Sequence, residues 1–195
     1  MELEPDLALQ GLQKLTAGSE EKNRLLQHFA MRLTEKNVDE AVLWATALET
    51  EEEKSLAFGK IALVLSAKEP ERAAHLLSDS GVAGREFDVA VVQVVQRWAA
   101  QAPADAAAWV GLFDPGDARR AGLKEIVAVW TRDDPEAAFS WIAAIQDEQL
   151  RNEAAAGMAE TILDQPDSVQ PNLLKLASPE MRALFEKLKA ERTGE

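Results

Sequence analysis

The sequence predicts an all-α protein, a right-handed α-solenoid of about six helix-turn-helix repeats that forms a single domain of 195 residues. Three observations predict this fold. The chain repeats itself with a period of about 32 to 33 residues, prolines recur where the copies begin, and no segment alternates apolar and polar residues as a half-buried strand would. Because one such helix pair cannot bury its apolar face alone, the copies are expected to stack on one another.

Each copy opens on an anchor residue at the start of its first helix. The anchors are Pro5, Val38, Pro70, Pro103, Pro135 and Pro166. Proline suits this place because the first helical turn needs no backbone N–H donor, and nearby acidic residues suit the positive end of the helix dipole. The copies span about 5–36, 37–68, 69–101, 102–133, 134–165 and 166–192.

Two helices joined by a short turn are expected in each copy, which makes about twelve helices. In chain order they are 5–16, 20–35, 38–49, 51–67, 70–78, 84–101, 103–113, 117–132, 135–145, 148–164, 166–177 and 179–192. Turn-forming residues at 78–81 and 114–117 separate the helices of a copy. The valine-rich segment 89–95 is interpreted as a buried helix, because helix-compatible residues flank it.

Tryptophans mark two positions of the repeat. Trp44, Trp109 and Trp141 lie six residues after their anchors, whereas Trp98 and Trp130 lie near the ends of second helices. This regular spacing indicates a core column that fills the gap between copies. The alternative is an exposed tryptophan row that acts as an interaction hot spot.

The two helices of a copy differ in character. The first helices are apolar nearly all round, and residues 104–113 carry Asp105 as their single charge. The second helices are amphipathic, as residues 118–130 illustrate. The first helices are therefore expected to line an inner wall and the second helices a solvated outer wall.

A proline between copies, a Trp six residues after it and a Leu three residues after that Trp, as in Trp109 and Leu112, resemble the tetratricopeptide-like repeats. The resemblance covers residues 5 to 192. The chain departs from that pattern at Phe113, which stands where a Gly is usual, and it contains no Tyr. The recurring acid-Pro-x-Ala-Ala-x-x-Trp opening is more similar to divergent bacterial helical repeats of that superfamily. The resemblance implies a helical repeat fold and the binding of peptide segments.

Composition excludes several classes of partner. The net charge of −13 argues against a nucleic-acid backbone or an anionic lipid surface. No apolar run approaches the length needed to span a bilayer. The acidic residues Glu2, Glu4 and Asp6 stand where a signal peptide would be positive, so a cytoplasmic protein is expected, with export after removal of a signal left open.

Candidate chemical groups favour structural roles. The chain has no cysteine, and its two histidines, His28 and His75, lie in different copies without a motif partner. No metal-ligand motif, phosphate-binding glycine loop or nucleophile-elbow sequence around Ser140 is present. We therefore expect no catalytic residues, no cofactor and no metal, and we predict that the protein is not an enzyme.

A basic residue recurs near the start of the second helix in four copies, as Lys54, Arg119, Arg151 and Arg182. The helix dipole disfavours a cation there, so something must compensate its charge. Pairing with acids three or four residues earlier, or a bridge to the next copy, is one interpretation. The other is a ladder of cations that reaches the carboxylates of a partner.

Five apolar residues are the candidate partner-binding positions, because tetratricopeptide-like geometry would place them on the inner wall: Val42, Leu77, Val110, Phe139 and Ile142. Superhelical curvature either buries this row within the chain or leaves it as an apolar groove. The expected function is a non-catalytic protein–protein interaction scaffold that presents the inner wall to a peptide or helix. The alternatives are a self-associating structural protein that forms a homodimer, and a regulatory module that binds a small ligand.

Overall fold

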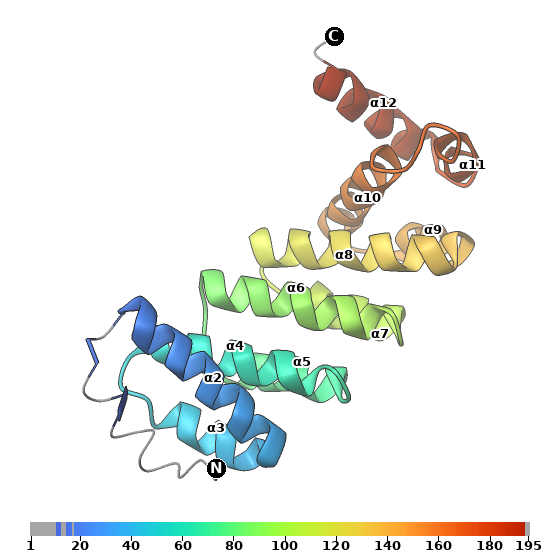
Figure 1. Ribbon diagram of the computed structural model, residues 1–195. Helices are drawn as coiled ribbons and strands as arrows, with labels where there is room; N and C mark the ends of the chain where they lie inside the picture. The colour runs from blue at the N-terminus through green and yellow to red at the C-terminus, as the bar shows by residue number, and fades with distance from the viewer. Residues whose placement is uncertain (1–10, 13–14, 17, 194–195) are drawn as a thin grey trace. The chain divides into compact units, whose positions relative to one another are not determined.

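The computed structural model describes residues 11–12, 15–16 and 18–193, and in this part of the chain it is all-helical, with eleven helices and no strand (Figure 1). In chain order the helices are α2 (Glu20–Lys36), α3 (Val38–Thr46), α4 (Glu51–Leu65), α5 (Pro70–Asp79), α6 (Arg85–Ala99), α7 (Pro103–Gly111), α8 (Asp117–Asp133), α9 (Pro135–Ala144), α10 (Glu148–Leu163), α11 (Gln170–Leu174) and α12 (Pro179–Thr193). Most of the expected first helix, 5–16, lies outside the described residues. Each of the other expected helices corresponds to one of these, and the valine-rich segment 89–95 is helical as expected.

The helix predicted at 166–177 is much shorter in the structure, where α11 covers Gln170–Leu174. The physical reason is Pro171, which lacks the N–H that a longer helix would need and whose ring clashes with the preceding turn. The backbone before it forms a tight turn instead, in which the Val169 N–H donates to the Pro166 carbonyl at 2.8 Å. Proline is therefore accommodated near the beginning of α11 and not in a helix interior.

Polar side chains cap the helices where the sequence places them. Asn37 accepts hydrogen bonds from the backbone N–H groups of Asp39 and Glu40, and Thr50 caps α4 in the same way. Asp134 and Asp147 cap α9 and α10. These bonds satisfy N–H groups that a helix leaves without a partner in its first turn, so local sequence sets the start of these four helices.

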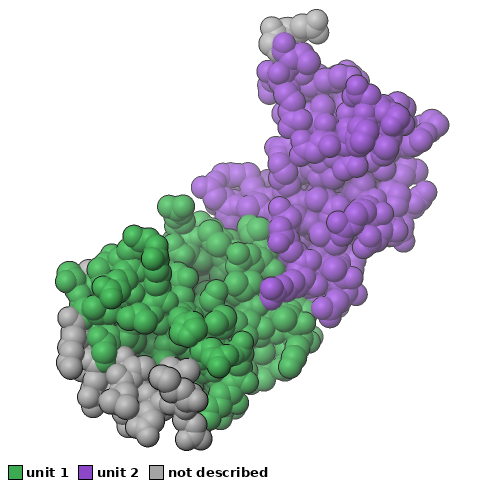
Figure 2. Space-filling view, viewed as in Figure 1, with its two compact units in different colours: residues 1–94 green, residues 95–195 purple. Residues whose placement is uncertain are grey.

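The chain divides into two compact units, residues 1–94 and residues 95–195 (Figure 2). The division falls inside α6. Whether the chain also behaves as the single domain expected from the sequence stays a prediction.

Unit 1 has its core between α2, α3 and α4. Phe29 of α2 packs edge-on against Trp44 of α3, with ring centroids 4.9 Å apart. Ile61 of α4 is fully buried in the same cluster. A buried ion pair between Lys22 and Glu53, 2.6 Å apart, also joins α2 to α4. Apolar packing and one enclosed ion pair thus hold the second helices of the first two sequence copies together.

Unit 2 repeats one aromatic contact at two places. Trp98 of α6 packs against Trp109 of α7 with ring centroids 6.0 Å apart, and Trp130 of α8 packs against Trp141 of α9 at 5.7 Å. Each pair joins the end of a second helix to the first helix of the next copy. Trp98 and Trp109 are buried and the other pair is half-buried, so the core column predicted from the tryptophan spacing is confirmed here.

Two glycines allow the helices of unit 2 to approach closely. A Cβ added at Gly122 of α8 would lie 3.0 Å from a methyl group of Val110 in α7. A Cβ at Gly157 of α10 would lie 3.1 Å from the Cα of Lys124 in α8. The second neighbour is backbone and cannot rotate away, so α8 and α10 pack at a distance that only glycine permits.

We expect Gly157→Ala to lower the free energy of unfolding by roughly 1–3 kcal/mol, because α10 must shift away from α8. Chemical denaturation measures this change. Gly59→Ala is the matched control, since its Cβ would make only an ordinary 3.5 Å contact with Ala90. In that helix interior alanine should stabilise by about 0.5–1 kcal/mol. Equal effects of the two substitutions would contradict the close α8–α10 packing.

Candidate functional site

The structure buries most of the predicted inner-wall row. Leu77 and Val110 are 1% and 0% exposed, and both belong to the core. Val42 is half-buried against the core of unit 1. For Leu77 and Val110 the expectation of an open apolar groove is wrong, and burial within the chain, the other outcome considered, is what occurs. The reason is close packing, which the small residue Gly122 permits beside Val110.

Phe139 and Ile142 are also buried, at 7% and 3% exposed, but they border a groove inside unit 2. We call it the α9–α12 groove, and its volume is about 810 Å³. Its apolar surface comes mainly from three helices: Phe139, Ile142 and Ala143 of α9, Ala155 and Ala156 of α10, and Met181 and Leu184 of α12. Leu176, in the turn before α12, adds a rim residue that is 38% exposed. The groove therefore combines a mostly buried floor with an accessible apolar edge.

Local sequence positions these walls. Phe139 and Ile142 are three residues apart in α9, so they lie on one face of that helix. The α12 wall begins where the Ser178 hydroxyl accepts a hydrogen bond from the Met181 N–H at 3.2 Å, directly before Pro179. The polar residues of the groove are Glu148, Arg151, Asn152, Ser178 and Glu180.

Three arginines of unit 2 share one contact. The guanidinium group of each donates a hydrogen bond to a backbone carbonyl at the end of the preceding first helix or in the turn after it. The pairs are Arg119 with Phe113 at 3.1 Å, Arg151 with Ile145 at 2.9 Å, and Arg182 with Ala177 at 2.9 Å. Because these carbonyls have no partner in the helix ladder, the arginines satisfy acceptors that would otherwise need water.

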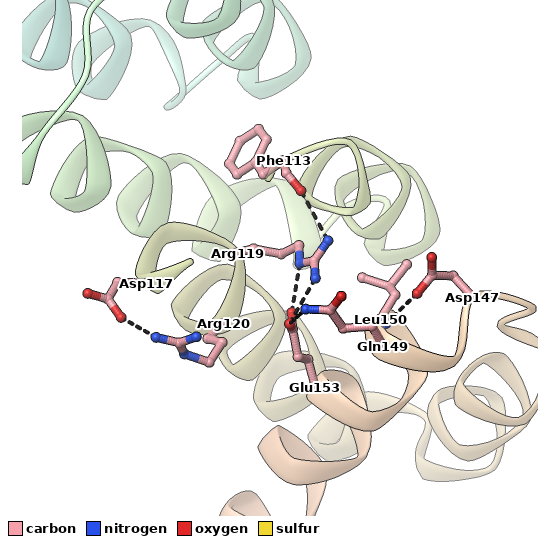
Figure 3. A network of polar contacts seen from close by, with 8 residues as sticks. All are labelled: Phe113, Asp117, Arg119, Arg120, Asp147, Gln149, Leu150 and Glu153. Carbon is pink, nitrogen blue, oxygen red and sulfur yellow. Dashed lines mark hydrogen bonds and ion pairs between the residues drawn. The ribbon is translucent and has the colours of Figure 1, made fainter. Parts of the chain in front are cut away.

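Arg119 makes two further bonds, which Figure 3 shows. Its Nε and Nη2 donate to the two carboxylate oxygens of Glu153, at 2.7 and 2.8 Å, and so join α8 to α10. Both side chains are largely buried. The hydrogen bond from Arg119 holds the pKa of Glu153 below its usual range, against the opposing effect of burial. The expected bridge from this cation to the next copy is confirmed for Arg119.

The other three cations of the predicted ladder are compensated differently. Lys54 pairs with Glu51, three residues earlier, at 2.8 Å. Arg151 and Arg182 use the backbone carbonyls described above. Within the described part of the chain, neither arginine forms an ion pair. Sequence reasoning considered acids as partners and missed the carbonyls, since their position depends on how each first helix ends.

A second groove lies between α8 and α10 and has a volume of about 830 Å³. All of its charged groups except Glu148 are already paired within the chain. Lys124 lies 2.6 Å from Glu160, Arg120 pairs with Asp117, and Glu153 is held by Arg119. This groove offers a partner fewer unsatisfied groups than the α9–α12 groove does.

The side chains singled out for chemistry lie apart. His28 is exposed on α2, and His75 is exposed on α5 with its Nε2 3.9 Å from Glu71. Ser140 is exposed on α9. Among the described residues no group of three metal-ligating side chains converges, and no helix there is long and apolar enough to cross a membrane.

The sequence and the structure were also compared with known proteins. No family model matches the chain, and no curated protein or solved structure matches it.

We expect Glu153→Gln to lower the free energy of unfolding by roughly 2 kcal/mol at neutral pH, because the buried guanidinium loses its charged acceptor. The lowered pKa of Glu153 means that the wild-type advantage is complete above the ordinary glutamate pKa. It is lost as the pH falls through the lower pKa of the folded state. Denaturation across the acid range measures this.

The control for that series is Glu186→Gln, which removes an exposed carboxylate from α12. It should change stability by less than about 0.5 kcal/mol. A deficit of Glu153→Gln that stays constant from neutral to acid pH would show that the ion pair is not its source.

Proposed function

We propose that this protein is a non-catalytic interaction module that holds an apolar segment of another protein in the α9–α12 groove. The observation that carries this proposal is the groove itself, whose floor includes Phe139, Ile142 and Met181 and whose rim exposes Leu176. An apolar side chain of a partner would pack on this floor and remove the exposed apolar edge at Leu176 from water. Since rigid helices form the walls, a peptide or helix would bind without first ordering the receptor.

We further propose that the helix pairs continue one another as a right-handed solenoid, similar in kind to tetratricopeptide-like repeats. Contacts inside each unit support this arrangement. The second helices of successive copies pack together, α2 on α4 in unit 1, and α8 on α10 and α10 on α12 in unit 2. The recurring tryptophan pairs of unit 2 have the nearest-neighbour character of repeat proteins.

Selection from a displayed library of random 12-residue peptides tests the groove as a binding site. We expect the wild-type protein to enrich peptides with clustered apolar residues. The double variant Ala143→Asp with Leu176→Asp should bind the enriched peptides at least about tenfold more weakly, because it places two charges at the apolar rim. Fluorescence polarisation with the synthetic peptides measures the affinities.

Leu112→Asp is the matched control, because Leu112 is an equally apolar residue, 84% exposed, that does not line the groove. It should leave the affinities unchanged. All three substitutions replace side chains with exposed surface, so circular dichroism should show intact helices. A failure to enrich any peptide, or equal losses in the double variant and the control, would contradict binding in the groove.

A small amphiphile is the second candidate occupant. The groove volume of about 810 Å³ favours it, since it lies within the range of roughly 300–1,000 Å³ typical of small-molecule sites. Native mass spectrometry separates the possibilities. We expect the mass of one chain with nothing added across a concentration series. Retained added mass would favour the small ligand, and a mass of two chains would favour the self-associating structural protein.

A further inference from the structure

Arg119 and Arg151 occupy matching positions of two successive copies but have different partners. Each lies 16 residues after its anchor, Pro103 or Pro135, and each donates to the carbonyl that ends or follows the preceding first helix. In Arg119 the remaining donors, Nε and Nη2, hold both oxygens of the Glu153 carboxylate. Arg151 uses Nη1 for Ile145 and forms no ion pair in the described part of the chain.

The repeat shows which position lacks an acid. Glu153 lies 18 residues after the anchor Pro135, and the residue 18 positions after the next anchor, Pro166, is Leu184. Both residues belong to the second helix of the copy that follows their arginine. Arg119 therefore meets a carboxylate from its neighbour, whereas the neighbour of Arg151 supplies an apolar side chain.

Arg151 also lies where a partner can reach it. It is half-buried, and it lines the α9–α12 groove together with Leu184 and Met181. An arginine stays charged at any physiological pH, and its fork of donors matches a carboxylate in a bidentate pair. A guanidinium group with spare donors beside an apolar wall suits a ligand that is apolar and carries a single acid.

The other charged groups of the groove restrict the charge that a ligand can carry. Glu148 and Glu180 line the groove and are exposed. Two carboxylates and an overall charge of −13 repel a dianion more strongly than a monoanion. A carboxylate is thus favoured over a phosphate group or a nucleic acid.

We infer that Arg151 binds the side-chain carboxylate of an Asp or Glu in a partner segment whose neighbouring apolar residues fill the α9–α12 groove. The partner would take the place that Glu153 takes on Arg119. This inference rests on the proposed function, because it names the chemistry of the segment that the groove holds.

The test uses the random 12-residue library, displayed with no free carboxyl end, on the wild-type protein and on Arg151→Gln. The wild type should enrich peptides with an Asp or Glu beside apolar residues. Arg151→Gln should still enrich apolar peptides but lose the preference for an acid. For a synthetic acidic peptide, Arg151→Gln and a Glu→Gln change in the peptide should each weaken binding about tenfold, with little further loss when combined.

Leu184→Glu keeps every arginine and supplies an internal acid at the position that Glu153 has for Arg119. It should also weaken the acidic peptide about tenfold, whereas Leu184→Gln, with similar size and no charge, should weaken it less. This pair keeps the inference testable if Arg151→Gln loses its fold. Arg132→Gln, at an exposed arginine of α8 outside the groove, is the control that should change nothing.

The outcomes separate the two proposals. Apolar peptides without an acid preference, or an acid preference that survives in Arg151→Gln, would overturn the role of Arg151 and leave the groove as a binding site. Tighter binding of a phosphoserine peptide than of its glutamate counterpart would overturn the preference for a carboxylate. No enrichment by the wild type would overturn the proposed function and this inference with it.

Discussion

The interaction on which the described part of the structure depends is apolar packing between helices of neighbouring copies. The large residue at the end of one second helix fills the space beside the first helix of the next copy, as Trp98 does against Trp109 and Trp130 against Trp141. In unit 1 Phe29, from the middle of α2, packs against Trp44 of α3. Each pair is therefore stabilised mainly by its neighbours in sequence, which is the energetic pattern of repeat proteins.

At the ends of the helices, arginine side chains form hydrogen bonds with backbone carbonyl groups that the helix leaves without a partner. An arginine near the start of a second helix would be unfavourable by itself, because the helix dipole repels a cation there. In Arg119, Arg151 and Arg182 the guanidinium group meets a carbonyl near the negative end of the preceding helix. One side chain thus offsets two unfavourable helix ends.

Much of the helical pattern could be predicted from local sequence, because proline anchors and capping residues act within a few residues of themselves. The exception, α11, shows the same rule, because Pro171 restricts the helix locally where the repeat predicts a longer one. The candidate site was predicted less well. Leu77, Val110, Phe139 and Ile142 are all buried, but only Phe139 and Ile142 border the α9–α12 groove, and the repeat alone cannot distinguish these cases. The difference depends on the packing of α12, which belongs to the next copy and lies further along the chain, at Pro179–Thr193. The acceptors of Arg151 and Arg182 were missed because backbone carbonyls leave no mark in the sequence.

The leucine at position 184 has a consequence for how such a chain can evolve. Duplicated copies begin with the same contacts, and each copy interacts mainly with the next one. Exchanging an acid for an apolar residue in one copy then changes the contact with one neighbouring copy and leaves the contacts between other copies unchanged. Different copies can therefore acquire different roles. In this chain Arg119 forms a structural ion pair with the next copy. Arg151 forms no ion pair in the described part of the chain, so substitutions around it leave the ion pair of Arg119 in place.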